Sequence, residues 1–121
     1  MNDAAIHLFD INSAPWVPHN RFPTVETKVL ETKATHANIS LMKVKLEPGG
    51  VITKHIHPIE TETAVVVSGE VEFLYGEGEA EQVVLLKADT GVSIYPGTLH
   101  GIRNTSNAPV ELLAIHSPGV V

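Results

Sequence analysis

The sequence contains no cysteine. This absence excludes disulfides, thiolate catalysis, iron–sulfur clusters and zinc fingers built on cysteine, so any metal must be bound by nitrogen and oxygen atoms. Lys and Arg are also scarce, with 8 against 14 Asp and Glu, and the formal net charge is −6. Since the basic residues form no cluster, we expect no nucleic acid and no anionic membrane surface as a partner.

Long apolar segments are absent as well. No stretch approaches the roughly 20 apolar residues of a membrane span, and no basic region precedes an apolar stretch at the N-terminus. We therefore expect a cytoplasmic protein that does not enter the membrane. The chain has 121 residues, of which 43% are hydrophobic. That is the usual size of one domain with one core, so residues 1–121 are expected to form a single domain.

Apolar residues recur with period two or in short runs, separated by Gly, Pro, Asn and Asp, which predicts strands rather than helices. About ten short strands with close turns indicate an all-β fold, either a sandwich or a closed barrel. The expected strands are Ile6–Ile11, Val25–Thr32, Ile39–Leu46, Val51–His57, Glu62–Val67, Val71–Tyr75, Gln82–Leu86, Val92–Tyr95, Leu99–Arg103 and Val110–His116.

Residues 1–24 are the least regular part of the chain. Three prolines interrupt them, yet they carry too many apolar side chains for a solvated tail. We expect an N-terminal arm that packs back on the barrel, or an edge strand that pairs with a second subunit and covers an exposed sheet edge. On this ground we predict a homodimer.

Four side chains form a candidate metal site. His55 and His57 lie two apart in an expected strand, so both face the same side. Pro58 ends that strand, and the chain can then turn and bring Glu62 alongside. His100 follows a Pro-Gly turn at the start of another strand and supplies a fourth ligand. If the shared face is the barrel interior, these side chains present three imidazoles and one carboxylate to one metal ion.

The spacing of these residues resembles the two sequence motifs of the cupin superfamily. The first motif, Gly-x5-His-x-His-x4-Glu-x6-Gly, is matched at every position from Gly49 to Gly69. The second, Gly-x5-Pro-x-Gly-x2-His-x3-Asn, is matched at Gly97, His100 and Asn104. It departs where Asp89 replaces the glycine and Tyr95 replaces the proline. Both departures are at positions that shape the backbone, and the two motifs together span residues 49–104.

The resemblance implies a double-stranded β-helix, or jelly-roll barrel, with a six-coordinate metal. Four side chains would leave two adjacent positions for water, substrate or dioxygen. Nitrogen-rich ligands suit Fe, Mn, Ni, Co, Cu or Zn rather than Mg or Ca. The expected function is a dioxygenase-like oxidoreductase acting on a small substrate that chelates the metal through oxygen. The alternatives are a metal-dependent isomerase or lyase, and a non-catalytic metal-bearing module that binds or senses a small ligand.

Three further residues are candidates for a catalytic role. Glu60 is either a base near Glu62, or an alternative ligand, or an exposed turn carboxylate. Tyr95 either offers its hydroxyl to a substrate or packs on the turn. His116 either reaches the cavity, as an acid or base or to orient a ligand, or ends its strand at the surface.

The remaining histidines and several apolar residues have ordinary structural interpretations. Surface positions are expected for His7, His19 and His36. Alternating residues on the strands are expected to line the barrel, some of them as walls of a pocket: Met42, Val44, Phe73 and Tyr75. A structural role is expected for Asn104.

Overall fold

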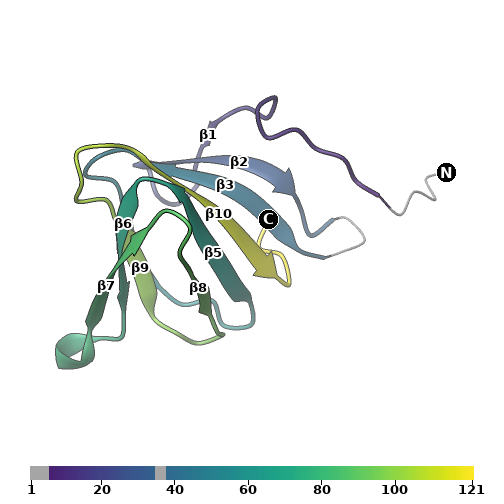
Figure 1. Cartoon of the computed structure of the whole chain (residues 1–121). Coiled ribbons are helices and arrows are strands. Elements are labelled where there is room, and N and C mark those ends of the chain that lie inside the picture. The colour runs from purple at the N-terminus through teal and green to yellow at the C-terminus, as the bar shows by residue number, and fades with distance from the viewer. Residues whose placement is uncertain (1–5, 35–37) are drawn as a thin grey trace.

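The computed structural model describes residues 6–34 and 38–121, which form two antiparallel sheets (Figure 1). In order across the six-stranded sheet lie β1 (Val17–Pro18), β2 (Val25–Glu31), β3 (Ser40–Leu46), β10 (Val110–Ser117), β5 (Thr61–Ser68) and β8 (Gly91–Ile94). The four-stranded sheet contains β4 (Val51–His55), β9 (His100–Arg103), β6 (Glu70–Tyr75) and β7 (Gln82–Lys87). A 3-10 turn, η1 (Gly78–Ala80), connects β6 to β7. No helix among these residues is long and apolar enough to cross a membrane.

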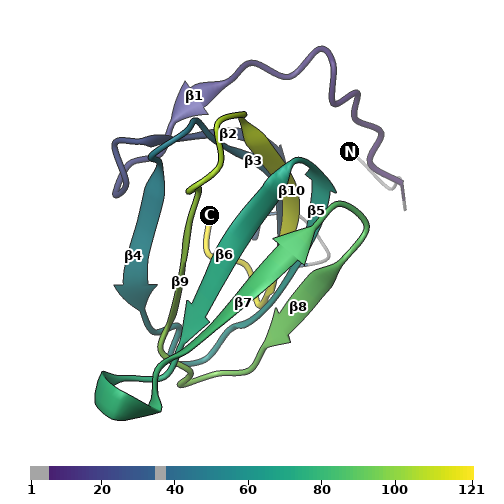
Figure 2. The same ribbon diagram turned by 60° about the vertical axis from the view of Figure 1, so that its left-hand side comes forward.

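The two sheets face each other across one core (Figure 2). From β3 onward the chain crosses repeatedly between them, since β4, β6, β7 and β9 belong to one sheet and β5, β8 and β10 to the other. This winding is that of a double-stranded β-helix, so the expected all-β barrel is confirmed.

The period-two pattern of the sequence determines which side chains enter the core. In β3 the residues from Ser40 to Leu46 alternate strictly between buried and partly buried, with Met42, Val44 and Leu46 inside. The lysines between them, Lys43 and Lys45, lie on the outer face. Alternation of this kind fixes the register, because a slip by one residue would turn every apolar side chain outward.

Two backbone positions explain why the motifs contain glycine. Gly69, in the turn between β5 and β6, has a φ of +82°. A Cβ atom there would lie 2.6 Å from the carbonyl oxygen of Pro109, which excludes any larger residue. Asp89 has a φ of +70°. It stands where the second motif has glycine, and Asp is one of the few side chains that tolerate this left-handed conformation.

Asn104, the last residue of the second motif, holds two turns together. Its side chain is 1% exposed, and its amide nitrogen donates hydrogen bonds to the carbonyl oxygens of Leu46 and Ala108. Its amide oxygen accepts hydrogen bonds from the backbone and hydroxyl of Ser106. The amide is therefore fully used by the fold, in the structural role expected of it.

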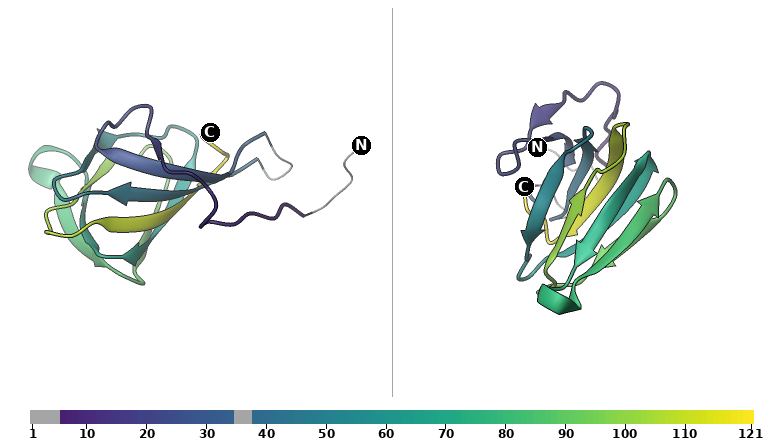
Figure 3. Two further views of the ribbon diagram at one scale, coloured as in Figure 1. Left: turned by 90° about the horizontal axis from the view of Figure 1, so that it is seen from above. Right: turned by 90° about the vertical axis from the view of Figure 1, so that its left-hand side faces the viewer.

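The N-terminal segment differs from its prediction. Ile6–Ile11 forms no strand, and the first strand is the short β1, which pairs with the edge of β2. Pro18 is the last residue of β1 and Pro15 lies two residues before that strand. Neither can donate a backbone hydrogen bond to a sheet, so regular pairing does not extend further. Residues 6–16 run outside the barrel (Figure 3).

Trp16 attaches this segment to the outer face of the six-stranded sheet. The ammonium groups of Lys28 and Lys45 lie 5.0 and 4.5 Å from the centre of its ring. Lys28 also donates a hydrogen bond to the carbonyl oxygen of Ile11. Upstream of these contacts Ile6 and Leu8 are 75% and 86% exposed. The homodimer expected from this apolar arm stays a prediction.

Candidate metal centre

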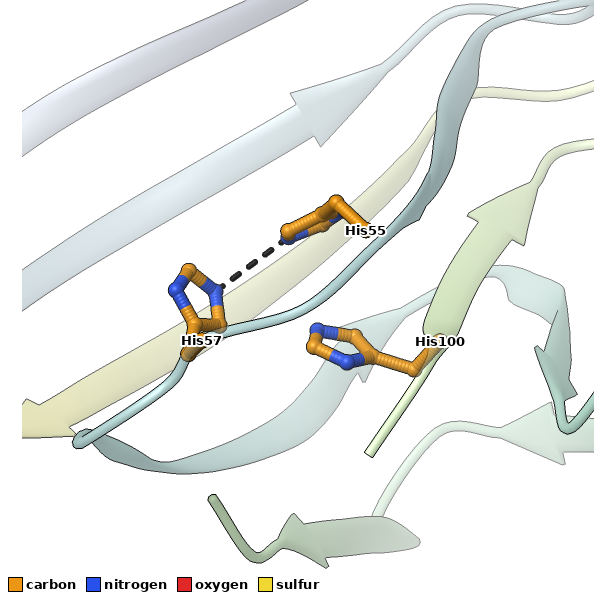
Figure 4. A group of neighbouring side chains, drawn as sticks. All are labelled: His55, His57 and His100. Carbon is orange, nitrogen blue, oxygen red and sulfur yellow. Dashed lines mark hydrogen bonds between the residues drawn. The ribbon is translucent and has the colours of Figure 1, made fainter. Parts of the chain in front are cut away.

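His55 and His57 converge although they do not share a strand. The predicted strand Val51–His57 ends two residues early, at His55, which is the last residue of β4 to pair with β9. His57 lies in the irregular segment that follows. The Nε2 atoms of the two rings are nevertheless 3.2 Å apart (Figure 4). The two rings face the same space, as expected. The reason differs from the expected one, because His57 lies beyond the end of the strand and strand alternation does not orient its ring.

The other two predicted ligands complete the cluster. His100, the first residue of β9, is the cross-strand partner of His55, and its ring points toward those of His55 and His57 (Figure 4). Glu62 extends from β5 in the opposite sheet. Its Oε1 atom lies 3.2 Å from Nε2 of His100 and 3.5 Å from Nε2 of His57. The fold thus brings all four predicted residues together.

The turn of the second motif supports this arrangement. The N–H of Gly97 donates a hydrogen bond of 2.9 Å to the carbonyl oxygen of His57, and the N–H of Thr98 donates to that of Tyr95. The irregular segment that carries His57 is therefore attached to the turn that precedes His100. The two motifs, distant in the sequence, position each other's histidines.

Backbone carbonyls set the tautomers of two of the histidines. Nδ1 of His55 lies 2.8 Å from the carbonyl oxygen of Thr53, and Nδ1 of His100 lies 2.8 Å from that of Thr98. Because a carbonyl oxygen only accepts hydrogen bonds, each Nδ1 carries the proton and each Nε2 presents a lone pair inward. Such contacts are the usual way in which proteins orient metal-binding histidines.

The arrangement of acceptors fits a bound cation. Nε2 of His100 is buried and has no hydrogen-bond partner among residues 6–34 and 38–121, yet it faces the Glu62 carboxylate at 3.2 Å. Two acceptors at this separation repel each other unless a proton or a metal ion lies between them. Separations near 3 Å are also those between neighbouring ligands around an ion bound at about 2.1 Å. Histidines 55, 57 and 100 form one group able to hold a metal, and His57, Glu62 and His116 form another.

Charge and burial shift the pKa values within the cluster. Burial raises the pKa of Glu62, but the neighbouring His100, His116 and His57 lower it by more, so it lies well below 4.5. Burial lowers the pKa of His100, but Glu62 and the Thr98 carbonyl outweigh this, and the result is above 6.5. Burial holds the pKa of His55 below that value. Glu62 is therefore a carboxylate at neutral pH, as a ligand must be.

The cluster lies in a mostly apolar cavity between the sheets. The cavity has a volume of about 190 Å³, far more than one ordered water needs. Besides the cluster, its polar lining residues are Thr27 and the loop residues His19, Asn20 and Arg21. The rest of its walls are apolar side chains from both sheets, among them Met42, Val44, Phe73, Ile94, Leu112 and Ala114. Tyr75, expected beside them, is 38% exposed and packs its ring against Phe73 instead of lining the cavity.

The three catalytic candidates have different surroundings. His116 is 4% exposed and lines the cavity, so the surface interpretation is wrong for it. Glu60 lies outside the cavity wall, with its carboxylate 3.7 Å from Nδ1 of His57. Tyr95 is 69% exposed and does not line the cavity.

One part of the cavity wall could not be predicted from the motifs. The loop from His19 to Phe22 lines the cavity, and the ring of Phe22 packs against that of His55 at 5.4 Å. His19, expected at the surface, accepts hydrogen bonds from the backbone N–H groups of Arg21 and Phe22. Of the other histidines, His7 is exposed and contacts Glu31, while His36 lies outside the described residues.

Comparison with protein families identifies the fold. The family model of the cupin domain matches residues 42–116, which is more than half of the chain. The chain belongs to the cupin family. The matched residues contain both motifs and all four predicted ligands of this cupin, together with His116.

Three relatives show how widely the similarity extends. Germin-like protein 5-1 of Oryza sativa subsp. japonica is 34% identical over 89 residues, covering 68% of this cupin but only 38% of the relative. An uncharacterized conserved protein with a double-stranded β-helix domain from Klebsiella pneumoniae superimposes with a TM-score of 0.75 at 26% identity, covering 95% and 92% of the two chains. A predicted oxalate decarboxylase from Thermotoga maritima gives 0.80 at 25% identity, covering 91% and 97%.

Proposed function

We propose that this protein is a metal-dependent enzyme, a dioxygenase-like oxidoreductase, acting on a small organic substrate that chelates the metal through two oxygen atoms. One observation carries the proposal: three imidazoles and one carboxylate converge at one place in a cavity whose walls are mostly apolar. His55, His57, Glu62 and His100 would hold the ion. When bound, the metal supplies a Lewis acid and a redox centre with positions left for substrate and dioxygen.

The chain's own residues account for the remaining requirements. The carbonyl oxygens of Thr53 and Thr98 hold two imidazoles with Nε2 inward. The apolar wall excludes bulk water and receives the carbon skeleton of the substrate. Enols, hydroxy-ketones and β-diketones combine a pair of oxygens with an apolar body, and they match this division of the cavity. Fe, Mn, Ni, Co, Cu and Zn all remain compatible with these ligands.

A second candidate is a metal-dependent lyase or isomerase. It is favoured by the similarity over nearly the whole chain to the predicted oxalate decarboxylase of Thermotoga maritima. A small carboxylate would use the same metal ligands. The mostly apolar wall favours a substrate with a larger apolar body than oxalate, whereas Arg21 in the lining offers a cation to a small carboxylate. This contrast makes substrate polarity the distinguishing property.

The experiment begins with metal analysis of protein purified without an affinity tag or added metal. We expect about one equivalent of a transition metal, lost in His100→Ala and kept in His7→Ala, whose histidine is exposed and outside the cavity. Oxygen uptake is then measured with β-diketones, enols and oxalate. Uptake with an enol or β-diketone supports the dioxygenase, whereas turnover without oxygen supports the lyase or isomerase.

A non-catalytic binding module would give a third combination of results in these two measurements. In that case the metal would be present and a small ligand would bind with no turnover under either condition. Absence of stoichiometric metal, even after reconstitution, would contradict the proposal as a whole.

A further inference from the structure

His116 lies beside the four proposed ligands, but the surroundings of its two ring nitrogens differ from those of His55 and His100. It lies on β10 directly opposite Glu62 of β5, as the cross-strand partner of that residue. Both strands are central in the six-stranded sheet. The relative position of the two side chains is therefore fixed by sheet register, whereas His57 depends on an irregular segment.

The contacts of the His116 ring are few and specific. Its Nε2 atom lies 3.4 Å from Oε1 of Glu62, and its ring meets that of His57 edge-on with centroids 4.9 Å apart. In the part of the chain that the structure describes, its Nδ1 atom is buried without a hydrogen-bond partner. The ring thus has a carboxylate at one nitrogen and no acceptor or donor from the described residues at the other.

This environment selects the tautomer opposite to that of His55 and His100. Those two rings donate from Nδ1 to a backbone carbonyl and keep Nε2 free. At His116 no such carbonyl is present, and a buried N–H without an acceptor is rarer in proteins than an acceptor without a donor. The proton of neutral His116 therefore belongs on Nε2, where Glu62 accepts it. A nitrogen that carries a proton cannot bind a metal.

We propose that His116 is a positioning residue, which donates a hydrogen bond from Nε2 to the Glu62 carboxylate and orients it toward the metal without being a ligand itself. The inference rests on the metal centre proposed above. It separates His116 from the group in which it could hold an ion together with His57 and Glu62. Because His116 would not bind the metal, the coordination position that it would otherwise fill stays open to substrate. Residues that orient a metal-binding carboxylate typically contribute about 10- to 100-fold to metal affinity.

Nitrogen NMR of the histidine rings tests the tautomer directly. Long-range proton–nitrogen spectra of the metal-free protein at pH 8 should show His116 protonated at Nε2 and His100 protonated at Nδ1. After addition of Zn²⁺, a diamagnetic probe, the Nε2 signals of His55 and His100 should shift to values of a ligated nitrogen, while that of His116 stays protonated. A His116 ring protonated at Nδ1, or ligated to zinc, overturns the inference.

Two variants test the positioning role by affinity. In chelator competition, His116→Leu should weaken Zn²⁺ binding by about 10- to 100-fold. His116→Gln, whose amide can donate from a position near that of Nε2, should recover most of the loss, and His7→Leu should show none. Equal losses in the Leu and Gln variants contradict the proposal. If the wild-type protein binds no metal at all, the proposed function fails, whereas the tautomer measurement still decides the hydrogen bond of His116.

Discussion

Nδ1 of His100 lies 2.8 Å from the carbonyl oxygen of Thr98, two residues earlier in the chain. His55 has the same relation to Thr53. In both cases the acceptor belongs to the backbone just before the histidine, so the local chain conformation itself determines which nitrogen is free. The candidate metal centre is thereby preorganised by two short segments, and these two histidines need no distant side chain to set their tautomers.

Removal of the His100 imidazole should empty the centre and leave the fold intact. His100→Ala removes a ligand, so the loss of metal affinity should exceed the roughly 10- to 100-fold typical of residues that only orient a ligand. His100 is not a member of the apolar core, whose packing between the two sheets the substitution leaves in place, so the circular dichroism spectrum should not change. His55→Ala should behave in the same way. Retention of stoichiometric metal in either variant would assign the ligand role to another residue.

Metal affinity should fall as the solution becomes acidic. The imidazoles bind metal only when neutral, and the pKa of His100 lies above its usual 6.5 because Glu62 and Thr98 favour the protonated ring. Protons therefore compete with the metal for His100 already at pH values above 6.5, and the competition weakens as the pH rises further. Chelator competition at pH 8, 6.5 and 5.5 measures the effect. Affinity that is equal at pH 8 and pH 5.5 would speak against histidine ligands.

The backbone at residue 89 should prefer glycine. Because φ of Asp89 is +70°, Asp89→Ala should lower the free energy of unfolding by about 1 kcal/mol. Asp89→Gly should keep or raise it, since glycine adopts this conformation without strain. Ala88→Gly is the control: at this neighbouring position, which has no positive φ, glycine should be destabilising. Urea denaturation gives the three values, and equal stability of the Ala and Gly variants at residue 89 would disprove the explanation.

The exposed apolar arm should bring two chains together. Leu8 is 86% exposed and Phe9 is 47% exposed, and large apolar side chains clustered in this way usually mark an interface. Light scattering should give twice the 13.0 kDa mass of one chain, and Leu8→Glu should shift the mass toward the monomer. A monomer mass that does not change with concentration would refute the homodimer.

Local patterns of the sequence were sufficient for most of the barrel. The alternation in β3 predicted which face points inward, because apolar and charged residues alternate from Met42 to Leu46. Glu62 and His100 were found because the motif spacings reflect turns with fixed backbone geometry, such as those at Gly69 and Asp89. These signals are local, and each depends on a few neighbouring residues.

Other features depend on contacts that leave no local pattern. Ile6–Ile11 has the apolar content of a strand, but in the described part of the chain it pairs with no other strand. For His116 the sequence left a cavity position and a surface position open, and its burial follows from the register with Glu62. The loop from His19 to Phe22 reaches the cavity only through tertiary packing, far in sequence from both motifs.

Trp16 is the only tryptophan of the chain, and two lysine ammonium groups lie over its ring. Its fluorescence therefore comes from a single place, the junction between the N-terminal segment and the outer face of the six-stranded sheet. Detachment of that segment would remove both cations from the indole and change its emission, while the cavity on the other side of the sheet stayed as it was. The protein thus contains a built-in optical reporter for the docking of its N-terminal segment, independent of the candidate metal centre.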